Sequence, residues 1–82
     1  MVSTTYTETP REKILQISGD ELELSLIQDR RGYGMITIID EHANQEIERY
    51  YALDMALDHV AELFAIRPDQ IPLPDEAQSL GL

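Results

Sequence analysis

Apolar and polar residues alternate through the first half of the chain, as they do in strands with one buried face. In the run ELELSLIQ, residues 21–28, the leucines fall on one side of an extended chain, and Glu23 and Ser25 fall on the other. The run KILQIS, residues 13–18, is rich in apolar and β-branched residues with polar interruptions. Both runs therefore predict half-buried strands.

Two short turns are expected between the strands. Gly19 and Asp20 fit a two-residue hairpin loop, in which glycine accepts a positive φ at the first position. Asp29 is a favoured first residue of a type I turn, and Gly32 would close that turn in the left-handed region. In the register that these turns imply, apolar side chains meet on one face, in the pairs Ile17–Leu22, Leu15–Leu24, Leu26–Ile36 and Leu24–Ile38.

The middle of the chain predicts a third strand and leaves the fourth open. The run YGMITII, residues 33–39, is typical of a strand, and residues 40–45 form a polar loop. The run EIERYY, residues 46–51, permits a fourth strand or the start of a long helix. We favour the strand because adjacent tyrosines suit an extended chain. Asp54 would then cap a new helix that begins at Met55.

The run MALDHVAELFAI, residues 55–66, predicts an amphipathic helix that ends before Pro68. The chain is thus expected to be an α+β protein, with an antiparallel three- or four-stranded β-meander followed by one C-terminal amphipathic helix packed on one sheet face. Residues 11–67 would form this single ββββα domain. We expect residues 1–10 to be a flexible N-terminal arm and residues 68–82 to be a proline-rich extended or disordered tail.

A single helix covers only one face of such a sheet. The other face would carry four apolar residues among polar ones, namely Ile14, Ile27, Met35 and Ile39. A semi-apolar, uncovered face on a small domain is a candidate surface for a protein partner or for a second copy of the chain. This face is our candidate partner surface.

Composition and charge narrow the possible chemistry. The 82 residues include 16 acidic and 6 basic side chains, a net charge of −10, and no cysteine. The lack of cysteine excludes disulfides, cysteine-ligated metal centres and thiol catalysis. The acidity either reflects adaptation to a salty cytoplasm or serves a basic partner, and it repels phosphate and anionic membranes at long range.

The chain shows no arrangement of residues typical of a catalytic or metal site. His42 and His59 are far apart, and the donors of the loop that contains Asp40 and Asn44 lack the glycine and spacing of a calcium loop. We therefore expect no enzymatic activity, no cofactor and no metal. No apolar run reaches the roughly 20 residues that span a bilayer, and the N-terminus does not resemble a signal peptide. We expect a cytoplasmic protein without membrane contact.

Basic residues gather near the second turn. Arg30, Arg31 and Tyr33, with Arg49 on a neighbouring strand, form a candidate basic contact for single-stranded nucleic acid. In element order alone, four strands and a helix resemble the single-stranded-DNA-binding fold of positive cofactor four, and such an order does not by itself confer function. The small number of basic residues disfavours nucleic acid, and a solvated hairpin tip is the simpler interpretation.

Acidic residues recur along the predicted helix. Asp54, Asp58 and Glu62 lie at positions i, i+4 and i+8, so they would line one helix face as a candidate acidic stripe. Such a stripe suggests either an acidic DNA-mimic inhibitor of a basic enzyme or an ordinary solvated face.

The function that the sequence favours is that of a small acidic, non-catalytic protein-interaction or regulatory protein. We expect it to form a homodimer through the uncovered sheet face. The nucleic-acid-binding regulator and the DNA mimic are the alternatives.

Overall fold

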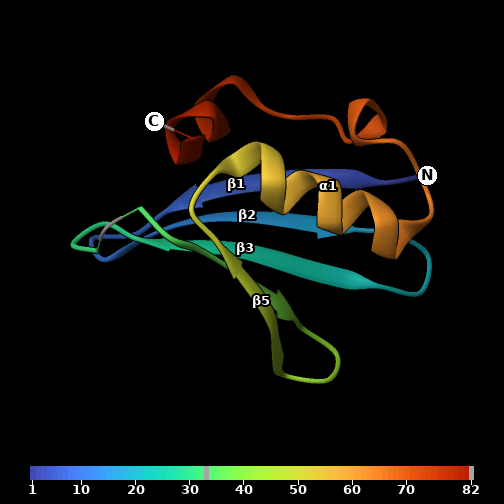
Figure 1. The fold of residues 1–82 in the computed structure, drawn as a ribbon, viewed down its shortest axis with the longest axis horizontal. Coiled ribbons are helices and arrows are strands. Elements are labelled where there is room, and N and C mark those ends of the chain that lie inside the picture. Colours follow the sequence, from blue (N-terminus) through green and yellow to red (C-terminus); the bar gives the residue numbers. More distant parts are fainter. Residues whose placement is uncertain (33, 82) are drawn as a thin grey trace.

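The chain folds into one antiparallel sheet whose five strands follow one another in chain order (Figure 1). The computed structural model describes residues 1–32 and 34–81. The strands are β1 (Ser3–Glu8), β2 (Glu12–Ser18), β3 (Glu23–Asp29), β4 (Ile36–Asp40) and β5 (Gln45–Tyr50). The predicted α+β class is confirmed, but the sheet has five strands rather than three or four.

The additional strand is β1, which lies in the segment where we expected a flexible arm. Its six residues pair with β2 along their whole length, from Ser3 opposite Ser18 to Glu8 opposite Lys13. Threonine and tyrosine, which make up most of this segment, favour extended structure. The expected arm is therefore an edge strand of the sheet.

The β2–β3 hairpin has a longer loop than predicted. Ile17 lies opposite Leu24 rather than opposite Leu22. The Gly19 N–H donates to the Leu22 carbonyl at 2.9 Å, and four residues rather than two connect the strands. Because the register shifts by two residues and side chains alternate with that period, the leucines keep their predicted face.

The turn after β3 forms where it was predicted. The Gly32 N–H donates to the Asp29 carbonyl at 3.1 Å. The positive φ, however, falls at Gly34 (84°) and not at Gly32, so the loop continues further before β4 begins. The register again shifts by two residues, which places Leu26 opposite Ile38.

The segment that permitted a strand or a helix forms a strand, β5. Its pairing with β4 contains a bulge, because Ile38 lies opposite Glu48 whereas Ile39 lies opposite Glu46. Ile47 is therefore the extra residue. Bulges of this kind bend an edge strand and increase its twist.

The helix α1 (Leu53–Phe64) begins two residues earlier than predicted. Its N-cap is Ala52, which makes no side-chain hydrogen bond, so Asp54 lies inside the first turn and the prediction of Asp54 as the cap is wrong. At the other end, Ala65 adopts a left-handed conformation with φ 58°. This conformation ends the helix before Pro68 is reached.

The tail, residues 68–81, is structured and packs on the sheet. It contains two 3₁₀ helices, η1 (Pro68–Gln70) and η2 (Asp75–Gly81). Ala77 and Leu80 of η2 are buried in the core. The expectation of an extended or disordered tail is therefore wrong. The apolar residues of the tail lack helical periodicity, but they are buried against the rest of the core.

The inner face of the sheet is covered jointly by α1 and the tail, which lie on the same side of it (Figure 1). The expectation that the helix alone covers this face is corrected accordingly. The core consists of residues from β2, β3, β4, α1 and the tail: Leu15, Ile17, Leu24, Leu26, Ile36, Ile38, Leu53, Ala56, Val60, Ala61, Ile71, Ala77 and Leu80. Within residues 1–32 and 34–81, no helix is long and apolar enough to cross a membrane.

Candidate functional site

The side of the sheet opposite α1 and the tail, here called the outer face, carries the predicted apolar residues. Ile14 and Ile27 are directly paired across β2 and β3. Ile39 belongs to the adjacent row of the same face, where it pairs with Ser25, and Met35 lies in the loop immediately before β4. All four apolar residues are half-buried. The structure therefore brings most of the candidate partner surface together as one strip.

The polar side chains beside this strip are bonded to one another. Glu23 accepts hydrogen bonds from Gln16 Nε2 at 3.1 Å and from Ser18 Oγ at 3.2 Å. Glu46 accepts two from the Arg49 guanidinium, at 2.8 and 3.0 Å. These bonds from Arg49 hold the pKa of Glu46 below its ordinary value and raise the pKa of Arg49. Two of the carboxylates on the outer face, those of Glu23 and Glu46, thus accept hydrogen bonds from neighbouring side chains.

The candidate basic contact is not assembled as one patch. Arg30 Nη1 lies 3.2 Å from Glu8 Oε1 and donates to the Thr9 carbonyl at 2.9 Å, so Arg30 is held at the β1 side of the sheet. Arg49 lies on β5 at the opposite edge. Arg31 is exposed on the turn, and Tyr33 falls outside the described residues. Two of the three arginines are therefore neutralised by neighbouring glutamates.

The candidate acidic stripe is present on α1. Asp54, Asp58 and Glu62 are all exposed. Their spacing places them along one face of the helix. This arrangement is compatible with a binding surface and equally with the solvated side of an amphipathic helix.

A contact between β5 and α1 was not foreseen from the sequence. The Tyr50 hydroxyl lies 2.8 Å from His59 Nδ1, and the two rings meet edge to face at 5.7 Å and 89°. Both side chains are half-buried. The pair attaches the helix to the edge strand that precedes it.

Several polar contacts attach the tail to the first three strands. The Tyr6 hydroxyl lies 3.2 Å from Ser79 Oγ, and burial raises the pKa of Tyr6 above its ordinary value. The Thr4 hydroxyl donates to the Pro72 carbonyl. These contacts depend on residues that are more than 60 positions apart in sequence, which explains why no local pattern indicated them.

The most deeply placed of these contacts involves Gln28, which is only 5% exposed on the inner side of β3. Its side-chain amide donates to the Leu80 carbonyl at 3.0 Å and to the Gly34 carbonyl at 2.8 Å. One buried amide therefore connects β3, the loop that follows it, and η2. In the sequence, the one indication of this role is that Gln28 follows Leu24 and Leu26 at an inward position of the strand.

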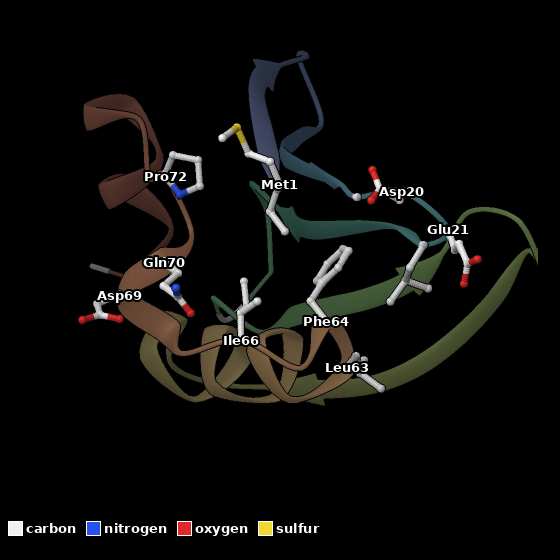
Figure 2. A pocket seen from close by; sticks show the side chains of 12 residues that line it. Met1, Asp20, Glu21, Leu63, Phe64, Ile66, Asp69, Gln70 and Pro72 are labelled. Atoms are coloured by element: carbon white, nitrogen blue, oxygen red, sulfur yellow. The ribbon is translucent and has the colours of Figure 1, made fainter.

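A pocket opens at one end of the inner face, where four segments meet (Figure 2). Its volume is about 920 Å³. Phe64 and Ile66 project into the hollow, Asp20 and Glu21 lie on one side, and Asp69 lies on the other (Figure 2). The lining comes from the N-terminus, the β2–β3 loop, the end of α1, and η1 with the residues after it: Met1, Val2, Gly19, Asp20, Glu21, Leu22, Leu63, Phe64, Ile66, Asp69, Gln70 and Pro72.

The shape of this pocket depends on a glycine. A Cβ atom on Gly19 would lie 2.7 Å from Cε1 of Phe64, which is closer than carbon atoms tolerate. The absence of a side chain at Gly19 lets the ring pack directly against the β2–β3 loop. The glycine thus serves close approach here rather than the predicted positive φ.

The polar loop between β4 and β5 is organised by its own hydrogen bonds. Asp40 Oδ1 accepts the backbone N–H groups of His42 and Ala43, at 3.0 and 3.2 Å. In the part of the chain that the structure describes, no group of three or more histidine, aspartate or glutamate side chains is placed to hold a metal ion.

Comparison with known proteins gives one match. A family model described as a family of unknown function, DUF7111, matches residues 1–82. No curated protein and no solved structure matches the chain.

Proposed function

We propose that the chain, which belongs to the DUF7111 family, is a small acidic, non-catalytic interaction protein that forms a homodimer through its outer face. The observation that carries this proposal is the half-buried strip formed by Ile14, Ile27 and Ile39 on a sheet face that neither α1 nor the tail covers. Contiguous apolar surface of this kind is typical of contact sites.

The strip is suited to a second copy of the chain because its centre is apolar, although Glu12 and Asp29 lie in the next row of the same face and carry charge. Each copy carries a net charge of −10, so most pairs of surfaces would repel one another. On the outer face, Glu23 and Glu46 are held by hydrogen bonds from side chains of the same copy. Two such faces would meet with apolar contact at the centre, with Glu46 paired to Arg49 beside it and the other carboxylates at the rim, in an isologous arrangement.

The size of the face predicts a reversible dimer. The sheet has five strands, which are spaced about 4.8 Å apart. Each strand is about six residues long, at roughly 3.3 Å per residue, so the outer face of one copy has an area of roughly 500 Å². The two copies would bury about 1,000 Å² together, which is below the roughly 1,600 Å² of a standard stable interface. We therefore expect monomer and dimer to exchange with concentration.

The other two functions are less well supported. Binding of single-stranded nucleic acid needs free basic groups on one surface, whereas Arg30 and Arg49 are paired with Glu8 and Glu46 at opposite sides of the sheet. The proposal of a DNA mimic requires an observation that distinguishes the acidic stripe from a solvated helix face. The exposure of its three residues fits both interpretations.

Replacing Ile27 with glutamate is expected to weaken the dimer at least about tenfold, because each copy then brings an uncompensated charge to the centre of the interface. Sedimentation velocity over a range of protein concentrations measures this shift. Met55→Glu is the matched control, since Met55 is a 53% exposed apolar residue on α1. That variant should dimerise like the unmodified chain.

A milder variant and the salt dependence complete the test. Ile27→Thr keeps the β-branched side chain and so protects the fold while removing apolar contact.

Raising the salt concentration from about 0.05 M to about 0.5 M should strengthen the dimer, because screening reduces the repulsion between two negatively charged chains. An unmodified chain that stays monomeric at every concentration and salt level contradicts the proposal.

A further inference from the structure

We propose a second binding site in the pocket between the β2–β3 loop, the end of α1 and η1. Its ligand is a basic peptide segment of a protein partner, in which a lysine or arginine stands next to an apolar side chain. The site lies at the end of the inner side of the sheet, away from the outer face. The proposal of this site therefore does not depend on the proposed dimer.

The floor of the pocket is apolar and incompletely covered. Leu22, Phe64 and Ile66 line it and are half-buried, and Leu63 at its rim is 41% exposed. The volume of about 920 Å³ lies within the range of clefts that bind small ligands or a few residues of a peptide. An apolar side chain of a partner would bury these surfaces and gain the corresponding transfer free energy.

The charge at the mouth of the pocket selects the partner. Asp20, Glu21 and Asp69 are the charged side chains in the lining, and all three are acidic. The N-terminal ammonium of Met1, which also lines the pocket, makes no ion pair with them within the described residues. Asp69 is paired with Arg67 at 3.1 Å. The carboxylates of Asp20 and Glu21 make no hydrogen bond or ion pair with any residue within 1–32 and 34–81. Two free acceptors thus stand together beside an apolar floor.

This combination favours a basic peptide over the other ligand classes. Phosphate and nucleic acid are repelled by the two carboxylates and by the net charge of −10. A purely apolar ligand would gain nothing from the carboxylates of Asp20 and Glu21, which are exposed. A lysine or arginine can meet the carboxylates with its charged group while its neighbour packs on Phe64, as in the groove-docking modes of peptide recognition.

A suitable probe is the peptide Gly-Leu-Lys-Leu-Gly, acetylated at its N-terminus and amidated at its C-terminus, titrated into the full-length ¹⁵N-labelled protein. We expect the amide signals of Gly19, Leu22, Phe64 and Ile66 to shift on binding. Replacing the peptide's lysine with glutamine, or both leucines with serine, should weaken binding, because each analogue loses one of the two contacts.

Two pairs of substitutions separate a specific site from general attraction. Asp20→Asn with Glu21→Gln should weaken binding of the probe about threefold to tenfold, the loss expected for two partly exposed charge pairs. Asp58→Asn with Glu62→Gln removes the same two charges from α1 and should change the affinity by less than about twofold. Equal weakening by both variants, shifts confined to α1 or the outer face, or no binding of the probe would overturn the proposal.

Discussion

Replacing Leu80 with alanine is expected to destabilise the protein by about 2–5 kcal/mol, the cost of removing a leucine from a packed core. Leu80 is 1% exposed although it stands two residues from the end of the sequence. A loss of this size is a large share of the roughly 5–15 kcal/mol that stabilises a typical domain. Chemical denaturation followed by circular dichroism measures it.

The control for this experiment is Leu63→Ala. Leu63 is 41% exposed on α1, so its truncation removes little buried surface and should cost less than about 1 kcal/mol. If the two variants were equally stable, the tail would not be part of the core. Truncation of Leu80 should therefore distinguish a docked tail from a frayed one.

Replacing Gln28 with methionine is expected to cost about 1–3 kcal/mol, although the two side chains have similar shapes. The substitution removes the amide that donates to the Leu80 and Gly34 carbonyls, and a buried carbonyl without a donor costs its desolvation energy. Hydrogen exchange should show faster exchange in η2, because this is the segment that the amide holds.

The matched control is Gln16→Met on β2. The amide of Gln16 donates to Glu23 Oε2 at 3.1 Å on the half-buried outer face, where water can replace the lost donor, so the cost should stay below about 1 kcal/mol. Both variants should be measured at a low protein concentration, at which the chain is expected to be monomeric. An unchanged exchange rate of η2 in Gln28→Met would contradict the proposed link between β3 and the tail.

The sheet was largely predictable from the sequence because alternation is a local signal. The faces of β2, β3 and β4 were predicted even though both hairpin registers were wrong by two residues. An even shift leaves each side chain on its face. Loop geometry decides the register, and the hydrogen bond from Gly19 to Leu22 could not be inferred from the composition of the loop.

The two ends of the chain were not predictable in the same way. Three of the six residues of β1 are threonines, and the strand shows no apolar alternation. The tail has prolines and no helical period, yet Ile71, Ala77 and Leu80 are buried. Their burial depends on contacts with strands far away in the sequence, and no local pattern reports such contacts.

The same distinction holds for the functional surfaces. The outer face follows from alternation along single strands, so Ile14, Ile27 and Ile39 could be assigned to it in advance. The pocket is built from four separate segments of the chain, and Asp20 and Phe64 both line it only because the fold brings the β2–β3 loop to the end of α1. Only the structure reveals a site of this kind.

The two proposed contacts respond oppositely to salt. Association of two outer faces joins chains of equal negative charge and should strengthen as salt increases. Binding of a basic peptide beside Asp20 and Glu21 joins opposite charges and should weaken. A salt titration of both equilibria therefore distinguishes an apolar interface from an electrostatic one on the same protein.

Intermolecular NOEs in a mixture of ¹³C-labelled and unlabelled chains test the proposed dimer most directly. We expect cross-peaks between the methyl groups of Ile14, Ile27 or Ile39 in one copy and outer-face residues of the other, and their loss in Ile27→Glu. Intermolecular cross-peaks confined to α1 or the tail, or none at concentrations high enough to populate a dimer, would contradict the proposal that the outer face joins two copies.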